Sequence, residues 1–207
     1  MARVIEPVHL RGEQLLEVTA VLARAFFDDP LLVYIEPDDD ARLRILPWFM
    51  GTGARYGHLF GEVYTTAGKV EAGAVWLTPG NTEVAPERMR QAGMDEAPAR
   101  LGEAAFGRFT KVMGHFASLH AREVAEEHWY LMILGVDPPR QGQGVGGALI
   151  QPVLARADAA GLRCYLETNK ARNVPFYRRH GFEVVVDADL PGGGPHLWTM
   201  LRPPRTR

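Results

Sequence analysis

The stretch that most constrains the fold is HWYLMILGVDPPRQGQGVGGALI, residues 128–150. Its first part, residues 128–136, is a continuous apolar run, which is typical of a strand buried on both faces of a sheet. Two prolines then end the strand, and a glycine-rich loop leads into a helix that should reach about Ala160. A glycine-rich turn at a helix N-terminus exposes backbone N–H groups, so this stretch predicts a phosphate-binding loop.

The segments after this loop alternate between strand and helix. Strands are expected at residues 162–168, 182–190 and 196–201, with a short helix over residues 173–180. Asn173 is predicted to cap that helix, and Gly181 to end it. Strand–helix–strand order indicates an α/β fold whose sheet contains at least one parallel pair.

The first 127 residues carry mainly helical patterns around one strand pair. Pro47 is expected to kink or break one helix, and another is expected to break around Pro98. The expected elements are a short strand (4–10), a helix (12–29), a loop (28–40), a helix (39–58), a strand–turn–strand unit (62–80) and a helical region (84–127). Because no linker divides the chain, we expect a single domain over residues 1–207.

The glycines alone fit two kinds of cofactor. Gly142, Gly144 and Gly147 match the G-x-G-x-x-G of dinucleotide-binding enzymes, and Glu167 lies about 20 residues beyond, where the ribose-binding acid would stand. From Gln141 onward the same stretch fits a Q-x-x-G-x-G loop for acetyl-CoA. DPPRQ makes the loop longer than a dinucleotide turn. A nicotinamide-dependent oxidoreductase is therefore the less favoured alternative.

Two separated motifs carry a family resemblance. LGVDPPRQGQGVGGAL resembles the acetyl-CoA-binding motif of the GNAT N-acetyltransferases, and NVPFYRRHGF resembles a second segment of that family. AFFDDP, VWLTP and GGPHLWTMLRPP extend the resemblance to the puromycin N-acetyltransferase-like branch, most weakly within residues 81–125. The resemblance implies a mixed sheet of about seven strands with helices on both faces. Its two central parallel strands, here residues 129–136 and 163–168, would splay apart.

The resemblance also implies how the chain is divided by function. Residues 129–186 would form the core that binds acetyl-CoA, and residues 10–125 would supply most of the acceptor site. The residues expected to bind acetyl-CoA are Leu134, Gly135, Val136, Gln141, Gly142, Gln143, Gly144, Val145, Gly146, Gly147, Asn173 and Tyr177.

Three residues are expected to take part in the chemistry. The resemblance assigns Tyr177 as the acid that protonates the leaving thiolate. The backbone N–H of Val136 would polarise the thioester carbonyl. Glu167, at the end of its strand, could accept the proton of the amine through a water, or could serve only as a structural hydrogen-bond partner. The candidate contacts for the acceptor are Asp28, Asp29, Tyr34 and Trp76, although core packing is the more ordinary role for Trp76.

The composition of the chain limits the classes of partner that it is expected to bind. A formal net charge of −2 argues against nucleic acid and against an anionic membrane. The single cysteine, Cys164, cannot form an internal disulfide and is expected to be a buried thiol, and the histidines show no metal spacing. We therefore expect a cytoplasmic, metal-free acyltransferase, monomeric or homodimeric, that acetylates the primary amine of a small molecule. An aminoacyl-nucleoside is one candidate acceptor, and a catalytically silent acyl-CoA-binding domain is the alternative.

Overall fold

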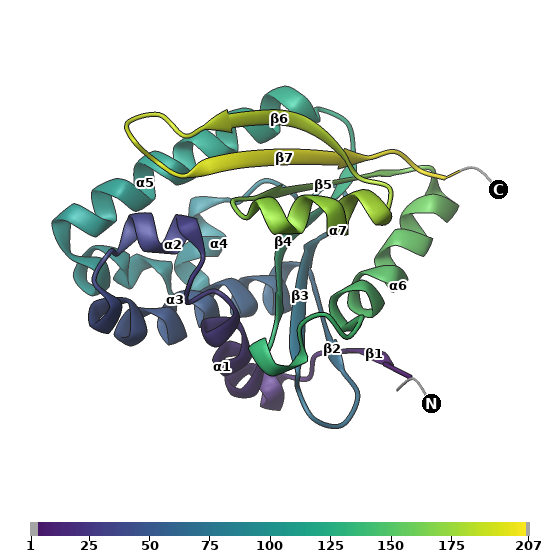
Figure 1. The fold of residues 1–207 in the computed structure, drawn as a ribbon, viewed down its shortest axis with the longest axis horizontal. Helices are drawn as coiled ribbons and strands as arrows, with labels where there is room; N and C mark the ends of the chain where they lie inside the picture. The colour runs from purple at the N-terminus through teal and green to yellow at the C-terminus, as the bar shows by residue number, and fades with distance from the viewer. Residues whose placement is uncertain (1–3, 206–207) are drawn as a thin grey trace.

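The computed structural model describes residues 4–205, which form one seven-stranded mixed sheet with helices on both faces (Figure 1). The strands lie in the order β1-β2-β3-β4-β5-β7-β6, and only the central β4–β5 pair is parallel. The strand bounds are β1 Pro7–His9, β2 Glu62–Thr66, β3 Ala72–Leu77, β4 His128–Val136, β5 Arg163–Thr168, β6 Glu183–Asp189 and β7 His196–Arg202. This confirms the predicted fold class.

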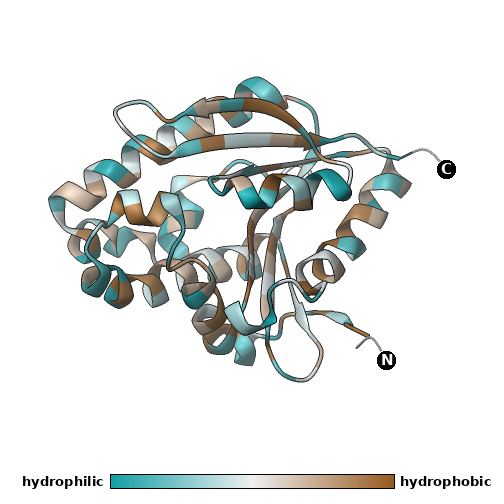
Figure 2. Cartoon of the chain, in the orientation of Figure 1, coloured by the Kyte–Doolittle hydropathy of each residue, from teal (hydrophilic) through white to brown (hydrophobic). Residues whose placement is uncertain are grey.

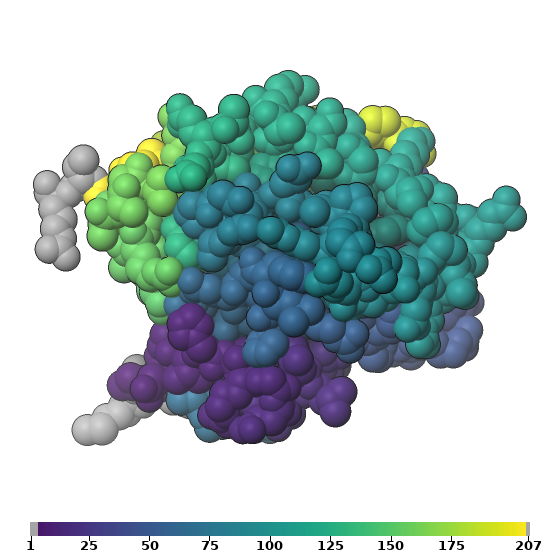
Figure 3. Space-filling model, turned by 180° about the vertical axis from the view of Figure 1, so that it is seen from behind, coloured from purple at the N-terminus to yellow at the C-terminus, as the bar shows by residue number. Residues whose placement is uncertain are grey.

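Seven α-helices surround the sheet within residues 4–205, and Figure 3 shows α1 and α3 at the back of the molecule. Their bounds are α1 Leu15–Ala25, α2 Pro30–Ile35, α3 Asp39–Phe60, α4 Pro86–Gln91, α5 Ala97–Glu123, α6 Val145–Ala160 and α7 Val174–Arg179. The alternation of side chains along β3 divides the core between two layers. Trp76 packs with the α6 and α7 layer, whereas Val75 packs with α1, α3 and α5.

Hydrophobic residues concentrate where these layers meet the sheet, along β3 and β4 in Figure 2. The close approach of α1 depends on glycine. A Cβ on Gly73 would lie 2.6 Å from Val18 Cγ2, and one on Gly135 would lie 2.6 Å from Leu22 Cδ2. These two glycines therefore let α1 pack directly against the centre of the sheet. Cys164 is fully buried, as expected.

The parallel pair β4–β5 opens along its length. Its register begins at His128 opposite Arg163 and ends at Tyr130 opposite Tyr165, yet β4 continues to Val136. The strands therefore splay, as predicted. On its other side β4 pairs with β3 through an irregularity that leaves Met132 as an extra residue between the pairs Val75–Ile133 and Trp76–Leu131. Such a bulge bends the strand at the point where it leaves β5.

Several local predictions were wrong. Residues 28–40, predicted as a loop, contain α2, because Asp29 caps a helix that begins with Pro30. Pro47 lies inside α3, which is not broken there. The break expected around Pro98 is confirmed, because α4 ends at Gln91 and α5 starts at Ala97, and α5 is itself interrupted at Gly102, where φ is 72°. Asn173 makes no capping hydrogen bond to α7. Gly181 follows α7 with φ 91°, as a helix stop requires.

Candidate active site

A cavity of about 210 Å³ lies at the opening between β4 and β5. Its wall is built from β4, from the end of β5, from α7 and from the helices α2, α3 and α5. Glu167, Asn173, Tyr177 and Asp29 line it, together with Leu134. A second hollow, between α1 and α3, includes Thr19 among its lining residues and none of the residues predicted from the sequence. The cavity at the splay is therefore the candidate active site.

The backbone of β4 presents polar groups that are not bonded to β3 toward this opening. In an antiparallel pair, alternate residues exchange hydrogen bonds with the partner strand. The N–H of Asp137 donates to the carbonyl of Glu71 at 2.9 Å, so Glu71 and Asp137 form a hydrogen-bonded pair. By alternation, the pairs Ala72–Val136 and Ala74–Leu134 are non-hydrogen-bonded pairs. The N–H and C=O groups of Leu134 and Val136 thus point away from β3 and toward the splay. Gly135 has its backbone turned to β3, and its missing side chain makes room for α1.

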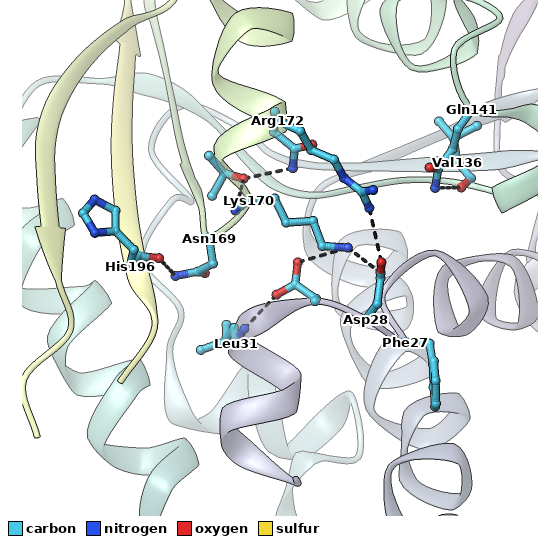
Figure 4. Close-up of polar contacts among 12 residues, drawn as sticks. Phe27, Asp28, Leu31, Val136, Gln141, Asn169, Lys170, Arg172 and His196 are labelled. Carbon is cyan, nitrogen blue, oxygen red and sulfur yellow. Dashed lines mark hydrogen bonds and ion pairs between the residues drawn. The ribbon is translucent and has the colours of Figure 1, made fainter. Parts of the chain in front are cut away.

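The side chain of Gln141 already uses one of these groups. Its Nε2 donates to the carbonyl oxygen of Val136 at 3.1 Å, which ties the glycine loop back onto β4 (Figure 4). Gln143 is held in the same way, since its Nε2 donates to the carbonyl of Pro139 at 2.9 Å. The loop is therefore fixed by side-chain amides at both glutamines.

The glycine loop ends in an uncapped helix N-terminus. Gly142 and Gly144 have φ of 75° and 81°, a left-handed conformation that favours glycine, and no atom lies within 4 Å of where their Cβ atoms would stand. Gly144 precedes α6, which begins at Val145, and no side chain caps this end. The first backbone N–H groups of α6, at Val145, Gly146 and Gly147, have no partner within the helix. The loop thus offers a row of donors and a helix dipole to an anion.

Tyr177 lies on α7 with only 6% of its surface exposed, and it lines the cavity. Its ring packs against Phe176 and Phe182. Burial, with the nearby Asp29 carboxylate, raises the pKa of its phenol, so Tyr177 holds its proton at neutral pH. Asn173, instead of capping α7, donates from Nδ2 to Thr168 Oγ1 at 3.0 Å and joins α7 to the end of β5.

Glu167 is a carboxyl group turned into the cavity from the end of β5. Its Oε1 is buried and makes no hydrogen bond to the described residues. Burial raises the pKa of this carboxyl to about 8, although the nearby phenols of Tyr130 and Tyr165 lower it in part and Glu123 raises it further. A carboxyl whose pKa lies near the working pH can take up and release a proton during turnover.

The two aspartates expected near the acceptor have different surroundings. Asp28 is exposed and forms an ion pair with Lys170, whose Nζ lies 2.6 Å from Asp28 Oδ1, and a second with Arg172 (Figure 4). It does not line the cavity. Asp29 is buried, accepts from the N–H of Leu31 at 3.0 Å, and does line the cavity; burial raises the pKa of its carboxyl. The cation of Lys170 also stands 3.9 Å from Asp29 Oδ2. Sequence analysis did not single out Lys170, because only the fold brings it beside the end of α1.

The two aromatic residues expected as walls of the acceptor site lie elsewhere. Trp76 is fully buried on the α6 side of the sheet, where its ring meets Trp129 edge to face at 6.4 Å. Tyr34 packs among hydrophobic residues of α2 and α5. Neither lines the cavity. Core packing, the more ordinary role for Trp76, follows from strand alternation, because its side chain leaves the sheet on the opposite face to Val75.

Two features are absent from residues 4–205. No group of three or more His, Cys, Asp or Glu side chains there is arranged to hold a metal ion. No helix in that range is long and apolar enough to cross a membrane.

Comparison with known proteins places this geometry in a family. The model of the acetyltransferase (GNAT) family matches residues 72–182, which include β4, the glycine loop, β5 and α7. An uncharacterized N-acetyltransferase of Schizosaccharomyces pombe is 28% identical over 171 residues, covering 80% of this chain and 69% of that protein.

Solved structures share the fold from end to end. A Corynebacterium glutamicum protein described as histone acetyltransferase HPA2 and related acetyltransferase has a TM-score of 0.71 at 21% identity, over 99% of each chain. Arylalkylamine N-acetyltransferase 2 from Aedes aegypti has a TM-score of 0.63 at 15% identity, over 98% of this chain and 100% of that one. With more than half of the sequence inside the family model and the splayed strands and glycine loop in place, the chain belongs to the acetyltransferase (GNAT) family.

Proposed function

We propose that the chain transfers the acetyl group of acetyl-CoA directly to the primary amine of a small molecule. The observation that carries the proposal is one cavity at the β4–β5 splay that combines outward backbone groups of β4, the phenol of Tyr177 and the carboxyl of Glu167. Acetyl-CoA supplies an activated acyl group, so the chain itself has to orient, polarise and move protons.

The residues present fit acetyl-CoA. The uncapped N-terminus of α6 and the loop Gly142–Gly147 would bind the pyrophosphate, since no side chain blocks those N–H groups. The backbone of Leu134 and Val136 would pair with the amides of the pantetheine arm as a neighbouring strand would. The Gln141 amide now bonded to the Val136 carbonyl supports this, because it shows that this edge accepts an amide donor.

Three groups of this chain would share the chemistry. The N–H of Val136 points into the opening and would stabilise negative charge on the carbonyl oxygen. Glu167 in its ionised form would accept the proton of the amine, directly or through a water, and the Tyr177 phenol would protonate the departing thiolate. The raised pKa of Tyr177 suits this last task, because the phenol still carries its proton at neutral pH.

An aminoacyl-nucleoside is the acceptor suggested by the resemblance to the puromycin N-acetyltransferase-like branch. Among the fold relatives, one named for arylalkylamines and one named as a polyamine N-acetyltransferase, from Drosophila melanogaster, act on small amines by their names. Incubation with puromycin and acetyl-CoA tests the nucleoside directly, and absence of acetylated product would remove it.

The proposal is tested by two measurements on the same protein. Calorimetry should detect binding of acetyl-CoA, and free-thiol release should rise when primary amines are added. No binding of acetyl-CoA would refute the proposal. Binding without amine-dependent thiol release for any member of a broad panel would instead favour a catalytically silent acyl-CoA-binding domain.

A further inference from the structure

The wall of the cavity is divided chemically into two parts. One part, here called the polar end, comes from the end of β5, from α7 and from the start of α2. It contains Glu167, Thr168, Tyr177 and Asp29. Two contacts tie these elements together: Asn173 of α7 bonds Thr168 at the end of β5, and the Asp29 carboxylate acts on the Tyr177 phenol. The polar end is where the amine would meet the acetyl group.

The other part, here called the apolar end, comes from α3, from α5 and from the segment before α5. Its side chains are aromatic rings and methionines. Phe49 and Phe109 meet edge to face, with ring centroids 5.5 Å apart, and Met94 and Met113 pack in the same hydrophobic cluster. Phe116 continues this wall along α5. Such a surface binds hydrocarbon and aromatic groups, and the methionines adapt to their shape.

Ionisable acidic side chains are confined to the polar end. Asp29 and Glu167 are the acidic side chains among the described residues that line the cavity, and none of the lining side chains is Lys, Arg or His. A carboxylate or phosphate on the acceptor would therefore find no cationic partner in the wall. A second ammonium group at the apolar end would find no carboxylate. Burying either charge unpaired is strongly unfavourable.

We infer that the acceptor is a primary monoamine carried on a compact, uncharged, apolar body, with its ammonium group at the polar end and its hydrocarbon or aromatic part among Phe49, Phe109 and Met113. This inference rests on the proposed function and narrows it. The cavity of about 210 Å³ is smaller than the roughly 300–1,000 Å³ of ordinary ligand pockets, which favours a compact molecule. An aminoacyl-nucleoside fits less well, because its ribose hydroxyls would be desolvated against the apolar end.

Matched pairs of acceptors test this on the unmodified protein at saturating acetyl-CoA. Phenylethylamine is compared with phenylalanine, which adds a carboxylate, and hexylamine with diaminohexane, which adds a second ammonium group. We expect kcat/KM to fall at least about tenfold for each charged member, because the added charge has no partner in the wall. Diaminohexane carries two reactive amines, which favours it statistically, so a fall in its kcat/KM cannot come from a loss of reactive groups.

A variant pair locates the effect in the cavity. Met113 is half-buried on α5, so Met113→Glu would place a carboxylate at the apolar end, while Met113→Gln keeps nearly the same shape without charge. The Met113→Glu variant should move the diaminohexane-to-hexylamine ratio of kcat/KM about tenfold toward the diamine, because the new carboxylate would pair with the second ammonium group. The Met113→Gln variant should leave that ratio unchanged. If Met113→Glu does not fold, the comparison of acceptor pairs on the unmodified protein still tests the inference.

The outcomes separate the inference from the proposed function. Acetylation of phenylalanine, diaminohexane or puromycin as efficiently as the apolar monoamines would overturn the inference and leave the acetyltransferase proposal standing. Equal shifts of the ratio for Met113→Glu and Met113→Gln would also overturn it. Failure of every amine to release thiol would refute the proposed function itself.

Discussion

Replacing Glu167 by glutamine should remove a pH-dependent cost to folding. Burial raises the pKa of the Glu167 carboxyl from 4.5 to about 8. Between those two values the folded protein holds a proton that the unfolded chain has released. Stability contributed by this proton is therefore lost as the pH rises, and the loss is complete above a pH of about 8. The Glu167→Gln variant has no proton to lose at this position and should lack this slope.

The size of the effect follows from the pKa. A proton bound in the folded state alone changes the free energy of unfolding by about 1.4 kcal/mol per pH unit. Between pH values of about 6 and about 8 the expected loss is about 2 kcal/mol, because the carboxyl is already half ionised at the upper limit. Stability is a cleaner measure here than the rate, since the proton of the acceptor amine also titrates in a pH–rate profile.

Urea unfolding of the parent and Glu167→Gln at several pH values across this range measures the difference directly. The gap between the two proteins should change by about 2 kcal/mol in favour of the variant as the pH rises. Glu127→Gln is the matched control. Because Glu127 is exposed, the difference in unfolding free energy between the parent and this variant should stay constant across the pH range. Parallel curves for the parent and Glu167→Gln would refute the raised pKa and, with it, the assignment of Glu167 as a base tuned to neutral pH.

Three further substitutions test the site and the fold. Tyr177→Phe should preserve acetyl-CoA binding by calorimetry and lower thiol release by about 10²-fold or more, since only the acid is lost; unchanged turnover would exclude that role. Gly144→Ala should lower the free energy of unfolding in urea by about 1–2 kcal/mol and weaken acetyl-CoA binding, because φ is 81° there. Gly107→Ala is the control: it lies inside α5 with open space around it and should raise the free energy of unfolding by about 0.5–1 kcal/mol. Changes of the same sign for both variants would contradict this reasoning. Asp158→Asn should destabilise the fold by about 3 kcal/mol in thermal unfolding, because it breaks a two-point contact with the buried Arg202. A loss below about 1 kcal/mol would place that pair among weak surface contacts.

Local patterns in the sequence were sufficient for the part of the candidate site formed by β4, the glycine loop and α7. The apolar run 128–136, the glycine loop and the short helix after Asn173 each follow from neighbouring residues, through hydrophobic periodicity, the conformational freedom of glycine and the constraints of proline. They identified β4, the start of α6 and the position of Tyr177 on α7 without any tertiary information.

Errors arose where a local rule competed with a tertiary contact. Asn173 has the side chain of a helix cap, but Thr168 lies within 3.0 Å and takes its amide hydrogen bond instead. Trp76 has the residue type of a ligand-binding wall, but strand alternation turns it into the core opposite Val75. In both cases the orientation of the side chain is set by packing and hydrogen bonding that the local rule does not take into account.

The sequence by itself determined the α/β order, the glycine loop before α6 and the family, because each depends on residues close together in the chain. Only the tertiary structure decided the chemistry of the cavity at the β4–β5 splay. Its apolar end joins α3 to α5, and its polar end joins Asp29 to Glu167 and Tyr177. These segments are far apart in the chain, so the confinement of ionisable acidic side chains to one end appears only once folding has brought them around the same space.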